Sequence, residues 1–211
     1  MKIIVTCGPA SSPIDHVRKI TNFATGEIGT LLCNALSQAG HEVTCFRGLG
    51  ASFTALPPSA ILRSFDTNES LLTLLEQWRG GADVVFHAAA LSDFAVESVE
   101  TDGAPVSKST GKISSATKSL VVRLAPAPKI LPLLHTLFPT AKIVGWKFEV
   151  DGTHESAISH GRRQIDSCHS AACVVNGPAY GPGFGFLEKE RMLHLESKQV
   201  LATFCADWLK K

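Results

Sequence analysis

The fold is decided by residues 2–9, KIIVTCGP, and residues 26–46, GEIGTLLCNALSQAGHEVTCF. The first segment is a run of β-branched and apolar residues that ends at Gly8, as is typical of a buried strand. The second segment carries apolar residues at helical spacing up to Gly40 and then ends in another short apolar run. A strand, a helix and a strand in this order predict a crossover unit of a parallel sheet.

The same alternation of strands and helices continues along the chain. We expect further strands at residues 60–65, 83–89, 120–124, 141–148, 171–176 and 190–195, the last of them at a sheet edge. We expect helices at residues 69–79, 128–137, 155–167 and 198–209, the first of them capped by Thr67 or Asn68. Together they predict one Rossmann-like α/β domain over residues 1–211, with an open, mostly parallel sheet and helices on both faces.

Two kinds of segment interrupt this alternation. Residues 48–58 and 177–185 are rich in glycine and proline and are expected to be loops. Residues 95–118 are rich in Ser, Thr, Gly and Lys and show no strong periodicity. A stretch of that length inside a compact domain is typical of a functional lid or a disordered insert. We therefore predict a long flexible lid or an arm at residues 95–118.

Charged residues are few and balanced. The 211 residues contain 20 Lys and Arg against 19 Asp and Glu, a formal charge of +1, and only 18% of the residues are charged. No field of one sign exists to attract nucleic acid or an anionic membrane surface. The apolar runs are far shorter than the roughly 20 residues of a membrane span, and the first residues do not resemble a signal peptide. We expect a cytoplasmic protein without nucleic-acid or membrane partners.

The cysteines and histidines show no metal-site spacing. The six cysteines include no Cys-x-x-Cys pair, and the eight histidines include no His-x-x-x-His pair. The nearest approach to a cluster is Cys168-His169 beside Cys173, where buried thiols are a better interpretation than a zinc site. We predict no metal site formed by the protein itself, and a reducing compartment.

Small and polar residues follow several predicted strands, where an open parallel sheet binds its ligand. Gly8 follows the first strand, residues 87–94 follow another, and Thr25 and Gly26 precede the first long helix. Hydroxyls and glycines at a helix start suit an anion; the alternative is that Thr25 caps the helix and the glycine only allows close packing. The absence of a G-x-G-x-x-G fingerprint and of a P-loop argues against the usual dinucleotide and kinase sites.

An ordered set of motifs resembles the phosphopantothenoylcysteine synthetase family. Residues 14–29, IDHVRKITNFATGEIG, are similar to the family signature I-D-x-V-R-x-I-T-N-x-S-S-G-x-x-G. Later segments agree in the same order: AAALSDF at 88–94, KI at 112–113, APKI at 127–130, VGWKFE at 144–149 and VVN at 174–176. The similarity covers nearly the whole chain and implies the family's fold. These residues do not include the flavin-binding decarboxylase half of many bacterial relatives, so the resemblance implies no flavin bound by this chain alone.

The resemblance implies an amide ligation in two steps, in coenzyme A biosynthesis. The carboxylate of 4′-phosphopantothenate attacks the α-phosphate of CTP (ATP in eukaryotic members), and the acyl nucleotide then reacts with the amino group of cysteine. Lys112 stands where the family keeps the lysine that balances charge at the α-phosphate as pyrophosphate leaves. Asn22 matches the asparagine that donates to the acyl carbonyl. Mg²⁺ is expected to travel with the triphosphate.

The same resemblance implies binding residues and partners. The nucleotide is expected to contact Gly8, Ala89, Ala90, Asp93, Pro128, Ile130 and Trp146, and the phosphates or the acyl substrate Arg18, Thr25, Gly26 and Asn176. A helix cap is the alternative role for Asp93, and a core position is the alternative for Trp146. In the family, the segment at 95–118 reaches a neighbouring subunit, so we expect a homodimer. A separate flavoprotein decarboxylase is a further expected partner.

The chain departs from the family pattern in its phosphate-binding segments. Pro9-Ala10 replaces the Gly-Thr that usually follows the first glycine, which removes an amide donor and a hydroxyl. The lysine motif shortens to KISS at 112–115, for which Lys108 and Lys118 are candidate replacements. Gly177 stands where an aspartate is usual.

These departures leave other functions open. One is a protein that binds a nucleotide or a phosphorylated small molecule without ligation, alongside a flavoprotein decarboxylase. Another is an NAD(P)-dependent reductase, in which Arg47 would face a 2′-phosphate. The missing glycine fingerprint and the lack of an acidic residue after the second strand argue against the reductase.

Overall fold

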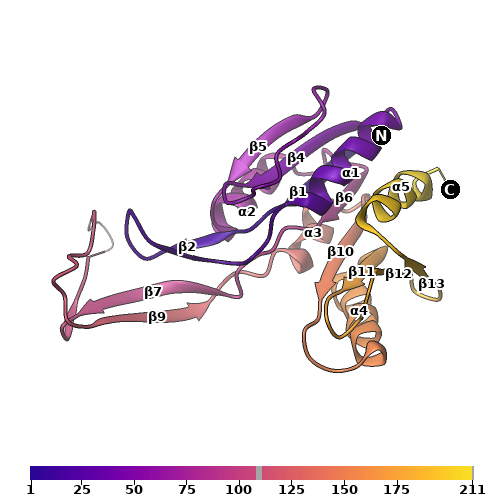
Figure 1. Cartoon of the computed structure of the whole chain (residues 1–211). Coiled ribbons are helices and arrows are strands. Elements are labelled where there is room, and N and C mark those ends of the chain that lie inside the picture. Colours follow the sequence, from indigo (N-terminus) through magenta and orange to yellow (C-terminus); the bar gives the residue numbers. More distant parts are fainter. Residues whose placement is uncertain (108–110, 211) are drawn as a thin grey trace.

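A computed structural model describes residues 1–107 and 111–210. Its centre is a sheet of eight strands in the order β13-β12-β11-β10-β6-β1-β4-β5 (Figure 1). In chain order these are β1 (Lys2–Cys7), β4 (Glu42–Gly48), β5 (Ile61–Phe65), β6 (Val84–His87), β10 (Lys142–Phe148), β11 (Ala172–Asn176), β12 (Phe184–Leu187) and β13 (Met192–Leu195). All neighbours from β5 to β11 are parallel, and β12 is antiparallel to both of its neighbours. The predicted Rossmann-like, mostly parallel sheet is confirmed.

The strand order reverses at the middle of the sheet. The chain runs outward from β1 through β4 to β5 and then returns to the opposite side of β1 as β6. Cys7 and His87, the last residues of β1 and β6, therefore flank the switch point where open α/β sheets bind ligands.

Helices cover both faces of the sheet. They are α1 (Glu27–Gln38) and α5 (Lys198–Trp208) on one face, and α2 (Asn68–Gln77), α3 (Leu131–Leu137) and α4 (His154–Cys168) on the other. Along β1, Ile3 and Val5 join the apolar cluster under α1 and α5, whereas Ile4 joins the cluster under α2 and α3. The β1 sequence is continuously apolar because both faces of the strand are buried.

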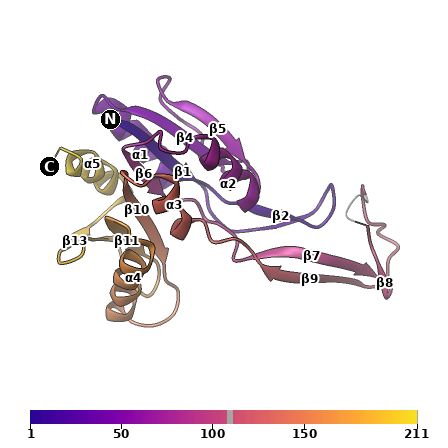
Figure 2. The ribbon, with the colours of Figure 1, turned by 180° about the vertical axis from the view of Figure 1, so that it is seen from behind.

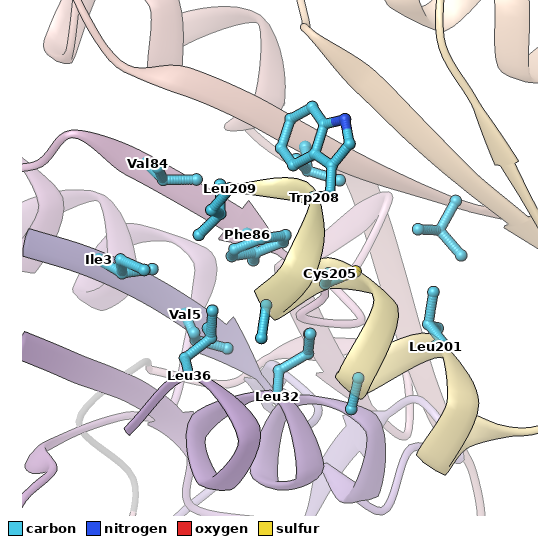
Figure 3. Close-up of a cluster of buried hydrophobic side chains, with 14 of the residues drawn as sticks. Ile3, Val5, Leu32, Leu36, Val84, Phe86, Leu201, Cys205, Trp208 and Leu209 are labelled. Atoms are coloured by element: carbon cyan, nitrogen blue, oxygen red, sulfur yellow. The ribbon is translucent and has the colours of Figure 1, made fainter. Parts of the chain in front are cut away.

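Figure 3 shows the cluster under α1 and α5, where Leu32 and Leu36 of α1 approach Val5, and Leu201 and Cys205 project from α5. The buried leucines are fully excluded from solvent. Burying a side chain of this size contributes about 1.5–3 kcal/mol to stability.

The predicted helices are all present, with ends shifted by a few residues. Thr67, and not Asn68, caps α2: the Thr67 hydroxyl accepts from the Ser70 N–H at 3.2 Å, and Ser70 Oγ accepts from the Thr67 N–H at 3.0 Å. α1 begins differently, because its N-cap is Gly26 in the left-handed conformation, with φ of 77°. Thr25 is therefore not the N-cap of α1.

The segment predicted to be a flexible lid or an arm contains strands, which its lack of periodicity did not predict. β7 (Phe94–Thr101), β8 (Ala104–Pro105) and β9 (Leu120–Pro126) form a separate three-stranded antiparallel sheet. This arm projects from the body of the molecule (Figures 1 and 2). The strand predicted at 120–124 exists, but it belongs to the arm. Most residues of β9 are exposed and most residues of β7 are only partly buried on both faces, so the arm lacks the alternation of a half-buried strand.

A second ribbon runs beside the arm. β2 (Ser11–Pro13) pairs with β3 (Lys19–Thr21), and Figure 2 shows β2 extending along β7. The Val96 N–H donates to Ser12 Oγ at 2.7 Å. The arm is thus fastened to the ribbon close to the body.

The C-terminal part of the sheet differs from the prediction in one strand. Residues 177–185 are not loop throughout, because β12 begins at Phe184. β13 forms the predicted edge strand. In the part of the chain that the structure describes, no helix has the length and apolar character needed to cross a membrane.

Candidate functional site

Three loops meet at the carboxyl end of β1. Gly8 and Gly26 both adopt φ of 77°, a conformation that favours glycine. A Cβ built on Gly8 would stand 2.9 Å from Ala51 Cβ, and one built on Gly26 would stand 3.0 Å from the same atom. The turn after β1, the start of α1 and the loop after β4 are therefore in contact through their smallest residues. The start of α1 offers a helix dipole to an anion at this point.

The segment after Gly8 holds few free donors. Pro9 has no N–H, the Ser11 hydroxyl already donates, and Ser12 Oγ already accepts a hydrogen bond. Ser11 Oγ donates to Asp66 Oδ1 at 2.5 Å, and Ser12 Oγ accepts from the Val96 N–H. The bond from Ser11 helps to hold the pKa of Asp66 below its ordinary value, so Asp66 stays ionised and keeps this partner. Both serines are buried, which makes the segment a structural support of the ribbon.

Asn22 joins the two sides of the switch point. Its Nδ2 donates to the main-chain oxygens of Leu91 at 2.9 Å and Ala90 at 3.3 Å. Ala90 in turn donates to the Gly8 carbonyl and accepts from the Ala10 N–H, each at 3.0 Å. The segment after β6 is thereby held parallel to the turn after β1, with the exposed Asn22 side chain above both.

Asp93 lies at the start of β7 and pairs with Lys129 across the root of the arm. No helix follows Asp93, so the helix-cap alternative is wrong. Its carbonyl accepts from the Ala127 N–H at 2.9 Å. Both partners of the ion pair are largely exposed, and an exposed pair contributes at most about 1 kcal/mol. The Asp93 carboxylate is therefore accessible to a ligand.

Asn68, the first residue of α2, fixes the segments on either side of Asp93. The Asn68 side chain is buried. Its Nδ2 donates to Ser92 O at 2.8 Å and to Pro128 O at 3.2 Å. Its Oδ1 accepts from the Ser92 N–H at 3.2 Å. From the sequence, Asn68 is predicted only as an alternative helix cap, so this role was missed. One buried amide thus sets the distance between the Ser92 and Pro128 segments, and Ile130 is buried in the cluster below them.

Trp146 is on β10 and packs against the cluster under α1 and α5. This packing agrees with the alternative prediction of a core position for Trp146. It is partly buried, and its Nε1 is buried without a hydrogen-bond partner among the described residues.

A second group of polar residues forms at the carboxyl ends of β10 and β11. Glu149 accepts from Lys147 Nζ at 3.1 Å and lies 2.9 Å from His160 Nδ1. Burial acts to raise the pKa of Glu149, but the His160 and Lys147 bonds outweigh it and hold that pKa below its ordinary value. The Glu149 N–H donates to Asn176 O at 2.9 Å. The next residue, Gly177, has φ of 112°, and a Cβ there would stand 2.4 Å from Glu149 O.

Lys112 and Arg18 lie together, but at the far end of the ribbon. The Ile113 N–H donates to Asp15 Oδ2 at 3.1 Å, and Arg18 Nη2 donates to Ile113 O at 2.6 Å. β7 alone spans roughly 25 Å at the usual rise of an extended strand, and the tip of the arm lies away from the body in both ribbon views. Lys112 is exposed and precedes Ile113, which is hydrogen-bonded to the Asp15 loop.

The structure therefore brings together only part of the predicted site. Gly8, Thr25, Gly26, Asn22, Ala89 and Ala90 surround the switch point, with Asp93, Pro128 and Ile130 at the root of the arm and Asn176 farther along the same sheet edge. Lys118 lies on the arm, and Lys108 lies outside the described residues. The described residues include no group of three or more His, Cys, Asp or Glu side chains that could hold a metal ion.

Comparison with known proteins identifies the family. The family model for the DNA/pantothenate metabolism flavoprotein C-terminal domain matches residues 1–204. The chain belongs to this family, the phosphopantothenoylcysteine synthetases. The coenzyme A biosynthesis bifunctional protein CoaBC of Thermococcus kodakarensis is 33% identical over 177 residues, which cover 83% of this chain and 41% of the relative. The chain thus spans less than half the length of that bifunctional relative.

Solved structures of the family share the fold. The DNA/pantothenate metabolism flavoprotein from Streptococcus pneumoniae superposes with a TM-score of 0.87 at 25% identity, over 100% of this chain and 98% of that one. A variant of Cab2 in complex with phosphopantothenate-cysteine gives a TM-score of 0.72 at 18% identity, over 99% of this chain and 87% of that one.

Proposed function

We propose that this protein is a phosphopantothenate–cysteine ligase that uses CTP. The observation that carries the proposal is the Asn22 link: the residue that matches the family's acyl-carbonyl donor is hydrogen-bonded to Ala90 and Leu91, directly above the Gly8 turn. The chain just after β3 and the segment that matches the nucleotide-binding motif therefore meet at one side chain. Family membership and the coenzyme A function named for the relatives support the same reaction.

In the first step, a carboxylate oxygen of 4′-phosphopantothenate attacks the α-phosphorus of CTP. A new P–O bond forms and the bond to the β-phosphate oxygen breaks, releasing pyrophosphate. The charge that shifts onto the leaving group is stabilised by Lys112 and by the Mg²⁺ that enters with the triphosphate. The turn after β1 at Gly8 and the start of α1 at Gly26 accommodate phosphate oxygens through main-chain N–H groups and the helix dipole.

In the second step, the cysteine amino group attacks the acyl carbon. The C–N bond forms, the C–O bond to the nucleotide breaks, the amine loses a proton and CMP leaves. Asn22 stabilises the developing oxyanion by donating from Nδ2, for which it releases one of its two main-chain carbonyls. Asp93 accepts from the base or sugar at the root of the arm.

We infer that the active form is a homodimer. Lys112 lies at the far end of the ribbon, so its side chain reaches a switch point only if that site belongs to a second copy. Exposed apolar side chains on the ribbon and arm support such contact; they are Val17, Phe94, Leu120, Val121 and Leu124. Analytical ultracentrifugation should show a dimer at micromolar concentration. A fully active monomer would contradict this assignment.

The reaction is tested directly with purified protein, CTP, Mg²⁺, 4′-phosphopantothenate and cysteine. Pyrophosphate should be released, with CTP preferred to ATP. Lys112→Ala should lower kcat by about 10²–10³-fold, since it removes a charge that acts in the transition state. Lys189→Ala, an exposed lysine in the β12–β13 turn, is the matched control. No turnover with either nucleotide at high protein concentration would refute the ligase.

A second candidate is a protein that binds a nucleotide without ligation. It is favoured by the segment after β1, where Pro9 has no N–H and both serine hydroxyls are engaged with Asp66 and Val96. Titration calorimetry with CTP separates the two: binding without product supports this candidate, and binding with pyrophosphate release supports the ligase.

We also infer a cytoplasmic location and a separate flavoprotein decarboxylase as a partner. The relatives named as bifunctional are more than twice as long as the matched segment, and the family resemblance assigns the decarboxylase to their other half. Affinity purification of the tagged protein from its own cells should recover a flavin-containing protein, and a flavin-free eluate would contradict the partnership.

A further inference from the structure

Asp15 is a buried carboxylate in the loop that joins β2 to β3. Its side chain is 1% exposed. Oδ1 accepts from the Val17 N–H at 2.8 Å and the Arg18 N–H at 2.7 Å, and Oδ2 accepts from the Ile113 N–H at 3.1 Å. The first two bonds close a local turn. The third reaches a residue 98 positions away, so a local turn does not explain it.

Arg18 binds the other side of the same residue. Its Nη2 donates to Ile113 O at 2.6 Å, and its Nε lies 3.5 Å from Asp15 Oδ2. Ile113 thus has both its N–H and its carbonyl bound to one Asp–Arg pair, and its own side chain is buried. Two residues before Ile113, the Gly111 carbonyl accepts from the His16 N–H at 3.0 Å. Lys112 lies between two residues whose main chain is held by the ribbon.

The physical chemistry of the pair favours a stable connection. A carboxylate removed from water is costly unless hydrogen bonds replace its hydration, and here three N–H donors and a guanidinium do so. The Ile113 N–H contributes most to holding the pKa of Asp15 below its ordinary value, with the amides of Val17 and Arg18 adding to it. Asp15 therefore stays ionised at neutral pH and keeps the connection.

We infer that Asp15, with Arg18, is a positioning residue that fixes the main chain around Lys112. The lysine side chain is left exposed at the tip. Because its main chain is already fixed, this segment loses little freedom when the nucleotide binds. The catalytic meaning of this assignment rests on the proposed ligase function. The anchoring itself does not.

The test combines hydrogen–deuterium exchange with kinetics on the full chain. Asp15→Asn keeps the size of the side chain but removes its charge and leaves one acceptor oxygen. Exchange in peptides covering residues 111–113 should become about 10-fold faster, and kcat should fall about 10–100-fold with little change in KM, as expected for the loss of a charge-assisted bond. The Asp15→Asn, Lys112→Ala double variant should be no slower than Lys112→Ala alone, because Asp15 acts through Lys112.

Asp102→Asn is the matched control. Asp102 Oδ1 accepts from the N–H groups of Lys118 and Ser119 elsewhere in the arm, so this change should speed exchange there and leave residues 111–113 and kcat unaltered. Unchanged exchange at Ile113 in Asp15→Asn would overturn the anchoring, and faster exchange with unaltered kcat would overturn the positioning role. An inactive wild-type protein would refute the ligase alone, because the exchange measurement still decides whether Asp15 holds Ile113.

Discussion

Asn22 donates from its side chain to the main-chain oxygen of Leu91 across 2.9 Å, and so ties the end of β3 to the loop after β6. Asn22→Asp replaces this donor by a carboxylate that faces two carbonyl oxygens. We predict a loss of about 10²–10³-fold in kcat for the ligation, measured as pyrophosphate and CMP release. Asn34→Asp is the control, because Asn34 also donates to two carbonyls, those of Thr30 and Ala55, in a part of α1 away from the site. An equal loss in both variants would point to a general folding defect.

Asn68→Asp should loosen the loops that carry Asp93 and Pro128. The buried carboxylate keeps the bond from the Ser92 N–H but faces the carbonyls of Ser92 and Pro128 without a proton to donate. We expect a stability loss of about 2–3 kcal/mol in urea unfolding and a raised KM for CTP. If KM for CTP is unaltered in the folded variant, these loops do not hold the nucleotide.

Gly177→Ala should destabilise the protein more than Gly181→Ala. Both glycines have positive φ, 112° and 92°, so alanine is strained at either position. Only at Gly177 does a Cβ also meet Glu149, at 2.4 Å from its carbonyl oxygen, whereas nothing lies within 4 Å at Gly181. We expect about 1 kcal/mol for Gly181→Ala and at least about 2 kcal/mol more for Gly177→Ala, from urea unfolding. Equal losses would show that the Glu149 backbone yields easily.

The free energy of unfolding should decrease as the pH is lowered, because of His87. This side chain is buried at the end of β6, with Nδ1 2.8 Å from Thr6 Oγ1, and burial lowers its pKa from 6.5 to about 4. Below pH 6.5 the unfolded chain binds the proton more readily than the folded one. The free energy of unfolding should therefore lose about 3 kcal/mol between pH 6.5 and pH 4 from this group. His87→Gln should remove that share of the slope, and an identical slope in the variant would disprove the assignment.

The central sheet could be predicted because its signals are local. The β1 strand is apolar throughout since both of its faces are buried, and α1 shows the spacing of a helix with one buried face. In the arm, only β9 gave such a signal, and β7 and β8 gave none. β7 has only one fully buried residue, Val99, and pairs with β9 from some twenty residues further along, so its stability depends on a partner that sequence spacing does not reveal.

The site could be predicted where residues match a family motif and not where long-range contacts decide their role. Ser11 and Ser12 follow the first strand, where an open parallel sheet binds its ligand, but Ser11 Oγ donates to Asp66 and Ser12 Oγ accepts from Val96, more than fifty residues away. Asn68 and Asp15 have structural roles that the sequence does not reveal. Each is an ordinary turn or cap residue in sequence, and each proves to hold a segment that comes from elsewhere in the chain.

Gly29 sets how closely α1 lies on β1. A Cβ at this position would stand 2.1 Å from Cys7 Cβ, so the helix rests on the strand with no space for a methyl group. Gly8 follows Cys7 and Gly26 precedes Gly29 by one helical turn, so the two glycines that line the switch point are carried on elements locked to each other. The spacing between Gly8 and Gly26 is therefore a fixed dimension of the scaffold, and a bound ligand cannot widen it by sliding the helix along the strand.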